Sequence, residues 1–515
     1  MPLSSTLGAL FERNARLYPR RSAVSYNGRE YTHADIAARM HRLASALRSS
    51  LPNQARVSIL SQNSIEYIET MGAAYLSGSI LVTLNWRLAV DELSRILADC
   101  EPAVLLFEEQ YIETVDRLRA ARPGMRLICV GEAPEWAEAY EDVLTSESTG
   151  FPATAVSPDD TACLIYTSGT TGVPKGVMLS HRGLLAGALA NCINTNAKTI
   201  DRVLITMPLF HVGATIMYLG YSVVGARTVL HRRFDAVQSL AAIRDEKITQ
   251  IHTAPTMIHQ LLSVDGSETY DTSSLTNIVY SSSPMLDDLL RRGVGRFGPI
   301  FTQIYGMTEY VGATCLQPYQ HVLDSEGAGR LASAGQPSQD TFVRIVDAEG
   351  NDCETGDIGE IAVSGTSMMQ GYWGAASAKS ILRNGWLHTG DLGYIDDESF
   401  VFIVDRKKDM IVSGGENIYS REVESAILTH PDVAEVSVIG VPDQRWGEAV
   451  KAFVVRRSGA EVSADEIIAF CKSKIASYKK PRSVEFVDAL PQLPSGKVDK
   501  KMLRQPFWEG QKRQI

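Results

Sequence analysis

A run of hydroxyl-bearing residues and glycines is the strongest chemical signal in the sequence. The segment YTSGTTGVPKGV (166–177) follows an apolar stretch at 162–165 that is typical of a strand. Accessible backbone N–H groups, hydroxyl donors and Lys175 could together surround a phosphate chain. The segment is not a Walker A loop, because Pro174 precedes Lys175 and no Ser or Thr follows the lysine. A tract of Gly, Ser and Thr alone would also suit a surface turn, but the complete string favours a phosphate-binding loop.

Three later segments carry charged residues that could complete such a site. QIYGMTE ends in Glu309, WLHTGD ends in Asp391, and Lys497 follows Pro-Ser-Gly. A carboxylate beside phosphate is repelled unless a cation lies between them, so Glu309 would bring Mg²⁺ to the site. Taken singly, these features are typical of a helix N-cap, a turn and a solvated tail lysine. Their value lies in occurring together.

In this order, the segments resemble the adenylate-forming superfamily of acyl- and aryl-CoA synthetases, stand-alone peptide-synthetase adenylation domains and firefly-type luciferases. The resemblance covers nearly the whole chain. It implies that ATP, with Mg²⁺, converts a carboxylic acid to an acyl-adenylate, which CoA then attacks to give an acyl-CoA and AMP. The ATP-binding residues that it implies are Thr167, Ser168, Gly169, Thr170, Thr171, Gly172, Lys175, Ser282, Ser283, Tyr305, Asp391 and Arg406.

The resemblance also implies individual roles. Tyr305 would stack on adenine, Asp391 would accept hydrogen bonds from the ribose hydroxyls, and Arg406 would bind ribose and phosphate oxygens. The catalytic set that it implies is Lys497, Glu309, Thr308 and His211, with Glu309 as the metal ligand. Lys497 would bridge the acid carboxylate and the α-phosphate. The SSSPM segment (281–285) departs from the family, which usually has glycine or alanine before this proline, but the backbone of Ser282 and Ser283 can still face adenine.

The acyl and CoA sites are implied by further segments. PLFHVGA (208–214) resembles the segment that borders the acyl pocket, whose implied residues are Phe210, His211, Gly306, Val311 and Gly312. The stretches that we expect to line the pocket, PLFHVGATIMY (208–218) and YVGATCL (310–316), add no acidic residue to Glu309. We therefore expect an apolar acid as the substrate, either a medium- or long-chain fatty acid or an aryl acid. The resemblance assigns Gly414, Gly415 and Arg233 to CoA and Lys408 to a hinge. We expect Lys407, Lys500 and Lys501 to be solvated charges.

The elements that must position these residues alternate between helices and strands. Helical spacing at 32–50 and 65–79 and strand-like runs at 55–61 and 80–85 begin a rhythm that continues to about residue 330. This rhythm predicts an α/β fold with mainly parallel sheets. Strands between Gly- and Asp-rich turns then predict a β-rich subdomain, followed by a small mobile α+β domain.

We place a large N-terminal domain at 1–404, a hinge at 405–409 and a C-terminal domain at 410–515. GVGRFG (293–298) fits a GxGxxG pattern, but it follows a helical stretch and precedes a strand. We therefore expect a helix-to-strand loop there, without a dinucleotide site.

Composition narrows the class of protein. A chain of 515 residues is expected to form at least two domains, and its net charge of -10 argues against a general nucleic-acid binder. The seven cysteines form no CxxC pair, and neither a long apolar run nor a signal-peptide pattern is present. We expect a cytoplasmic protein without a transmembrane segment, whose partners are an acid, ATP and CoA; a homodimer is left open.

Other functions on the same scaffold remain open. A stand-alone adenylation enzyme would load a separate carrier protein instead of CoA, and a luciferase-like oxygenase would share the same motifs. A non-catalytic nucleotide-binding module is disfavoured, because Glu309, Asp391, Arg406 and Lys497 are all present.

Overall fold

The structure is a computed structural model that describes residues 6–145, 156–168, 174–283, 285, 287–321, 323, 328–374, 381–413, 416–493 and 497–509. The chain forms two compact units. The first comprises Met1–Val343, Val363–Leu387 and Ser399–Val401, and the second comprises Arg344–Ala362, His388–Glu398 and Phe402–Ile515. The hinge expected at 405–409 stays a prediction.

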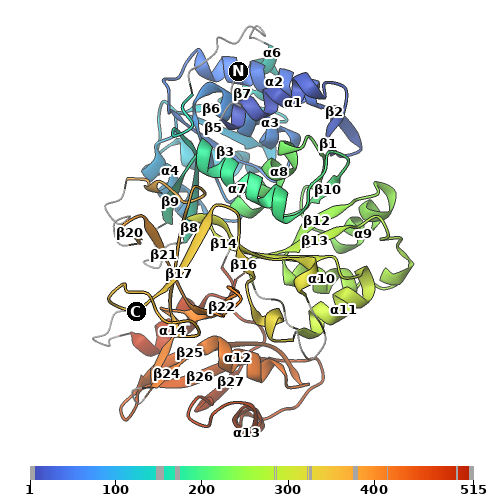
Figure 1. Ribbon diagram of the computed structural model, residues 1–515. Coiled ribbons are helices and arrows are strands. Elements are labelled where there is room, and N and C mark those ends of the chain that lie inside the picture. The colour runs from blue at the N-terminus through green and yellow to red at the C-terminus, as the bar shows by residue number, and fades with distance from the viewer. Residues whose placement is uncertain are drawn as a thin grey trace. The chain divides into compact units, whose positions relative to one another are not determined.

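In the described part of the first unit, one sheet has nine strands in the order β16-β15-β14-β13-β12-β10-β11-β1-β2 (Figure 1). The run from β14 to β1 is parallel, and β2, β15 and β16 pair antiparallel at the two ends. The strands are β1 (Ser22–Tyr26), β2 (Arg29–Thr32), β10 (Arg202–Ile205), β11 (Arg227–Leu230), β12 (Gln250–Thr253), β13 (Asn277–Tyr280), β14 (Phe301–Met307), β15 (Tyr310–Leu316) and β16 (Gln336–Pro337).

A second sheet of the first unit has the order β19-β9-β8-β4-β3-β5-β6-β7. The strands from β8 to β7 are parallel, and β8, β9 and β19 pair antiparallel. The strands are β3 (Arg56–Leu60), β4 (Ile80–Thr83), β5 (Val104–Glu108), β6 (Arg126–Val130), β7 (Glu138–Ala139), β8 (Thr161–Ser168), β9 (Pro174–Ser180) and β19 (Gly371–Tyr372).

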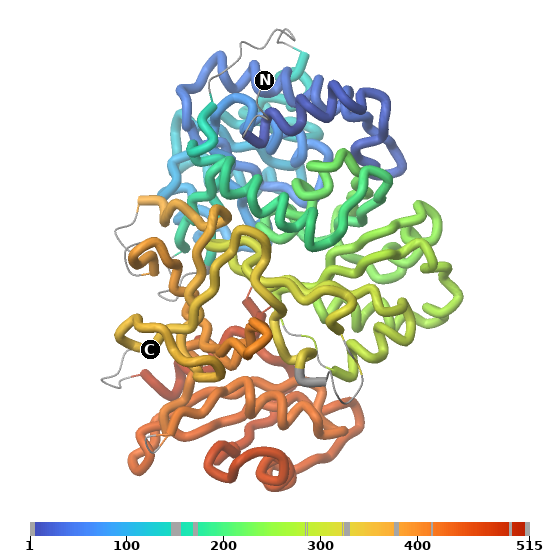
Figure 2. The backbone as a smooth tube through the Cα atoms, in the orientation of Figure 1, coloured from blue at the N-terminus to red at the C-terminus, as the bar shows by residue number. Residues whose placement is uncertain are grey.

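Helices cover these sheets in groups. One group packs together near the N-terminus, as the blue and green segments of Figures 1 and 2 show: α1 (Leu7–Leu17), α2 (His33–Arg48), α3 (Ile65–Ser77), α7 (His181–Asn194) and α8 (Val212–Val223). The others are α4 (Val90–Cys100), α5 (Ile112–Arg119) and α6 (Tyr140–Thr145) beside the second sheet, and α9 (Ala236–Asp245), α10 (Pro255–Leu262) and α11 (Asp287–Phe297) beside the first. Short 3-10 helices are η1 (Glu109–Tyr111), η2 (Ser267–Thr269), η3 (Pro318–Gln320) and η4 (Ala328–Ala332).

Two further sheets lie in the later part of the chain, where we predicted a β-rich subdomain and a small α+β domain. One contains β17 (Thr341–Val346), β18 (Gly359–Gly365), β20 (Leu382–Arg383), β21 (Trp386–Ile395) and β22 (Val401–Arg406). The other contains β23 (Ile411–Ser413), β24 (Glu416–Ile418), β25 (Val433–Asp443), β26 (Gly447–Arg456) and β27 (Ser483–Phe486). Helices α12 (Ser420–Leu428) and α13 (Ala464–Lys474) share an apolar core with this last sheet, and α14 (Lys500–Trp508) contributes Leu503 to a second one. The predicted fold class is confirmed.

Individual elements agree with the sequence in most places and differ in two. The helices expected at 32–50 and 65–79 are α2 and α3, and the strands expected at 55–61 and 80–85 are β3 and β4. The strand expected at 162–165 continues to Ser168, because β9 supplies an antiparallel partner. The loop predicted at 293–298 is wrong, since α11 continues to Phe297. Gly293 serves packing there: an added Cβ would lie 2.8 Å from the Phe301 ring.

The cysteines are all free thiols and lie in the described part of the chain. Cys192 in α7 and Cys353 in the second unit are partly exposed, and the other cysteines are buried. Burial raises the pKa of the Cys315 thiol to about 12. Within the described residues, no helix combines the length and hydropathy needed to cross a membrane.

Candidate active site

The phosphate-binding segment begins as a strand hairpin. Thr167 in β8 pairs with Lys175 in β9, and Ser168 pairs with Pro174. Gly169, Thr170, Thr171 and Gly172 lie outside the described residues, as does the side chain of Ser168. Antiparallel pairing therefore brings Thr167 and Lys175 to the same end of the hairpin.

Glu309 lies at the tip of a second hairpin, between β14 and β15. Thr308 and Glu309 form the turn, so this pair does not cap a helix. The hairpin is irregular between Tyr305 and Met307, and Gly306 permits the close approach: a Cβ there would lie 2.6 Å from the backbone nitrogen of Gly312. The turn leaves the Glu309 side chain 9% exposed.

Tyr372 joins these two hairpins, and sequence analysis did not single it out. Its hydroxyl donates a hydrogen bond of 2.8 Å to Oε1 of Glu309. The Nζ of Lys175 lies 4.9 Å from the centroid of the same ring, within reach of a cation–π interaction. Burial, and then the negative charge of Glu309, raise the pKa of the phenol, so Tyr372 stays a hydrogen-bond donor. One side chain thus contacts both groups that we expect to face the phosphates.

The PLFHVGA segment runs into the N-terminus of α8, where His211 is the residue before the first helical turn. Phe210 is buried, and its ring lies 4.3 Å from that of His211. Asn63, at the carboxyl end of β3, holds this segment in place. Its Nδ2 donates to the carbonyl oxygens of Met207 (2.9 Å) and His231 (3.0 Å), and its Oδ1 accepts from the N–H of Leu209 (2.8 Å).

Further hydrogen bonds fix the same segment. Thr83, at the end of β4, donates to the carbonyl oxygen of Phe210 (3.1 Å), and Thr215 donates to that of Leu209 (2.8 Å). Since β3 and β4 belong to one sheet and β10 to the other, the carboxyl ends of the two sheets meet at this segment. Ligands of α/β proteins commonly bind at such ends.

Of the other predicted acyl-pocket residues, Gly306 lies on β14, and Val311 and Gly312 lie on β15. Val311 is buried and lies close to Gly187 in α7, since a Cβ added to that glycine would be 3.4 Å from the Val311 side chain. Gly312 has φ +67°, and an ideal Cβ there would have its nearest neighbour, Ile304, at 3.9 Å. Gly312 therefore borders free space, whereas Val311 packs against a helix.

The predicted adenine segment follows β13 and is strained. Ser282 has φ +76°, a left-handed conformation that costs a serine about 1–2 kcal/mol. Ser281 beside it is hydrogen-bonded to Nε2 of the buried His252 at 2.8 Å. Burial lowers the pKa of His252 to about 4, so the imidazole is neutral. Ser282 and Ser283 are exposed, with their backbone at the carboxyl edge of the sheet.

In the second unit, Asp391, Arg406 and Lys497 lie in one electrostatic neighbourhood. The Nε of Arg406 is 2.8 Å from Oδ1 of Asp391, whose side chain is 5% exposed. Lys497 and Lys408 keep contact with solvent, yet surrounding protein groups displace part of their water and lower both pKa values. For Lys497, the positive charge of Arg406 lowers the pKa further, while Asp391 opposes that effect.

Three lysines that we expected to be solvated differ from one another. Lys501 is exposed, as predicted. Lys407 stays half-exposed but lies 2.9 Å from Oε2 of Glu360. The prediction for Lys500 is wrong: its Nζ lies 2.8 Å from Oε1 of Glu424 and donates to the hydroxyl of Ser420, because the burial of that glutamate requires a partner.

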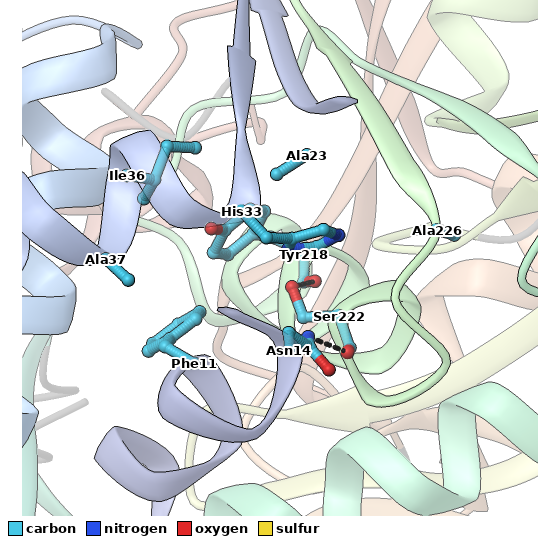
Figure 3. Close-up of a pocket in the computed structure, with 9 residues that line it drawn as sticks. All are labelled: Phe11, Asn14, Ala23, His33, Ile36, Ala37, Tyr218, Ser222 and Ala226. Atoms are coloured by element: carbon cyan, nitrogen blue, oxygen red, sulfur yellow. Dashed lines mark hydrogen bonds between the residues drawn. The ribbon is translucent and has the colours of Figure 1, made fainter. Parts of the chain in front are cut away.

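Arg233 is exposed in the loop after β11, and Gly414 and Gly415 lie outside the described residues. The small cavity of Figure 3 lies elsewhere, among α1, α2 and α8, where Asn14 donates to the carbonyl oxygen of Ser222. Its volume of about 10 Å³ has room for one water molecule and no substrate.

Comparison with known proteins assigns this chain to a family. The chain belongs to the AMP-binding enzyme family, whose profile matches residues 11–373, and the profile of the AMP-binding enzyme C-terminal domain matches residues 422–497. The family resemblance read from the motifs is thereby confirmed.

Individual relatives match over nearly their full length. Feruloyl-CoA synthase of Amycolatopsis sp is 38% identical, over 97% of this chain and 99% of the relative. The fatty acid–[acyl-carrier-protein] ligase of Streptomyces coeruleorubidus is 35% identical, over 100% of this chain and 99% of the relative. The solved structure of o-succinylbenzoate CoA synthetase from Bacillus subtilis, in complex with its acyl-adenylate intermediate, has a TM-score of 0.85 at 32% identity and covers 96% of this chain and 97% of that chain.

Proposed function

We propose that this chain is an AMP-forming carboxylic acid–CoA ligase that activates an apolar acid. The observation that carries the proposal is the neighbourhood of Asp391, Arg406 and Lys497, which joins a buried carboxylate for ribose to two cations for phosphate and carboxylate oxygens. The relative named as a feruloyl-CoA synthase supports the same chemistry.

In the first step, an oxygen of the acid attacks the α-phosphorus of ATP, the bond to the bridging oxygen breaks, and pyrophosphate leaves. Both reactants are anionic, so they must be held together while their charge is neutralised. Lys497 would contact the carboxylate and the α-phosphate, Thr308 would donate to the α-phosphate, and Lys175 with the loop N–H groups would hold the pyrophosphate.

Glu309 suits Mg²⁺ as the accompanying ion. Mg²⁺ in such sites takes one or two protein carboxylates together with substrate phosphates and water. The described residues contain no cluster of three or more His, Cys, Asp or Glu that would form an all-protein metal cage, so a single carboxylate beside a phosphate loop fits that pattern. Bound Mg²⁺ would neutralise the phosphates and orient the leaving pyrophosphate.

In the second step, the thiol sulfur of CoA attacks the acyl carbon, the thiol proton is lost, and AMP leaves with the carboxyl-derived oxygen. Gly414 and Gly415 would let pantetheine approach the backbone, Arg233 would meet a phosphate of CoA, and Lys408 would be the pivot. Phe210, His211 and the space beside Gly312 would face the acid. We include the cytoplasm in the proposal, because seven free thiols suit a reducing compartment. A homodimer stays a prediction.

One experiment tests the proposal. The chain is incubated with MgATP and a panel of fatty and aryl acids, with CoA in one arm and a phosphopantetheinyl carrier protein in the other, and products are followed by mass spectrometry. We expect acyl-CoA and AMP in equal amounts. Loading of the carrier protein alone would favour the second candidate, which the carrier-protein ligase among the relatives supports. Formation of ADP, or of no thioester, would refute both.

A further inference from the structure

Tyr372 lies where the two phosphate-facing hairpins meet. It is the second residue of β19, which pairs antiparallel with β9 so that Tyr372 is opposite Val177, two residues beyond Lys175. The N–H of Trp373 donates to the carbonyl oxygen of Gly176 (2.7 Å). This short strand is therefore fixed to the strand that carries the phosphate-loop lysine.

The same segment is also fixed to the Glu309 turn. The N–H of Met369 donates to the backbone carbonyl oxygen of Glu309 (2.9 Å), and the Tyr372 hydroxyl donates to its carboxylate oxygen Oε1 (2.8 Å). Both residues are buried, at 8% and 9% exposure, so their hydrogen bond is shielded from competing water. Within the described residues, the second carboxylate oxygen, Oε2, makes no hydrogen bond.

We propose that Tyr372 is a positioning residue that fixes the Glu309 carboxylate with Oε1 occupied and Oε2 available to Mg²⁺–ATP. The inference rests on the proposed function and adds a residue to it. A carboxylate on a turn can rotate about its side-chain bonds, and a hydrogen bond to one oxygen selects one orientation before the ion arrives. Groups that orient a metal ligand in this way commonly change metal affinity by about 10- to 100-fold when they are removed.

Tyr372→Phe is the informative variant, because it removes the hydroxyl and keeps the ring beside Lys175. Tyr140→Phe is the matched control: Tyr140 is a buried tyrosine whose hydroxyl donates to the buried carboxylate of Glu69 (2.8 Å), on helices away from the phosphate hairpins. The readout is the dissociation constant of ATP, measured by calorimetry without acid or CoA across a series of free Mg²⁺ concentrations and in EDTA.

We expect Tyr372→Phe to raise the Mg²⁺ concentration for half-maximal tightening of ATP binding about tenfold. Its ATP affinity in EDTA and its melting temperature should stay close to those of Tyr140→Phe. Glu309→Gln should shift the midpoint at least as far, and adding Tyr372→Phe to it should cause little further change, because the two residues act through one oxygen pair.

An unchanged Mg²⁺ midpoint in Tyr372→Phe would overturn the inference, as would fully additive shifts in the double variant. Equal weakening in EDTA would also overturn it, since the hydroxyl would then act on nucleotide and not on the metal ligand. Absence of ATP binding by the unsubstituted chain at every Mg²⁺ concentration is a different result, because it would refute the proposed function itself.

Discussion

Asn63 offers a direct test of how the PLFHVGA segment is held. Its side chain is 2% exposed and makes three hydrogen bonds to the backbone of Met207, Leu209 and His231. Each such bond contributes about 1 kcal/mol net, so Asn63→Ala should destabilise the fold by about 3 kcal/mol. Typical domains have about 5–15 kcal/mol of stability, so the variant should still fold.

The released segment carries Phe210 and His211, which we place beside the acid. If about half of the lost free energy, ~1.4 kcal/mol, falls on the complex with the acid, its KM should rise about tenfold. The KM for ATP should change little, because the hydrogen bonds that Asn63 makes to described residues go to Met207, Leu209 and His231 and not to the phosphate hairpin. The assay is acid-dependent pyrophosphate release, run beside denaturant unfolding.

Asn14→Ala is the control for this variant. Asn14 is equally buried and donates to the carbonyl oxygen of Ser222 at 2.6 Å, but it faces the small cavity of Figure 3. The Asn14→Ala variant should have a lower free energy of unfolding, while its KM for the acid stays unchanged. An unchanged acid KM in Asn63→Ala, or a parallel rise for acid and ATP, would refute the reasoning.

Three further predictions follow from other sites. Lys497→Ala should reduce adenylate formation about 10²–10³-fold yet leave thioester formation from preformed acyl-AMP largely intact; equal loss in both half-reactions, measured separately, would contradict this role. Gly312→Asn should shorten the longest acid accepted in an acid-panel assay, because asparagine tolerates the left-handed backbone and its side chain enters the space beside Ile304; an unaltered chain-length profile would place the pocket elsewhere. Burial lowers the pKa of His321 to about 4, whereas the imidazole of an unfolded chain titrates near its ordinary value of about 6.5. Between these two pH values only the unfolded chain binds the proton, so the free energy of unfolding should fall by up to about 3 kcal/mol as the pH is lowered from about 6.5 to 4. His321→Gln should flatten the pH dependence of the free energy of unfolding over that window, and an identical slope would argue against the neutral state.

Periodicity predicted the elements well because it reports burial directly. The helices α2 and α3 and the strands β3 and β4 lie where apolar spacing placed them. Periodicity failed at α11, because the glycines in this segment are typical of a loop. The reason for one of them, close packing of Gly293 against Phe301, cannot be recognised from the sequence. The extra length of β8 likewise depends on pairing with β9.

The candidate site was less predictable where function depends on contacts between distant segments. Motifs identified Glu309 and Lys175, but no local pattern marks Tyr372, whose partner is 63 positions away. Asn63 is hidden for the same reason, since its contact with Leu209 spans 146 positions. The prediction of a solvated Lys500 was wrong because this lysine pairs with Glu424, whose burial depends on packing in the second unit.

The distribution of thiols gives this chain a pair of natural attachment points. Cys192 belongs to the first unit and Cys353 to the second, and these two are partly exposed while the other cysteines are buried. Because a reagent reaches partly exposed thiols more readily than buried ones, a maleimide spin label should select these two. Electron–electron distance measurements on the native sequence could then follow the two units through each half of the reaction without engineered cysteines.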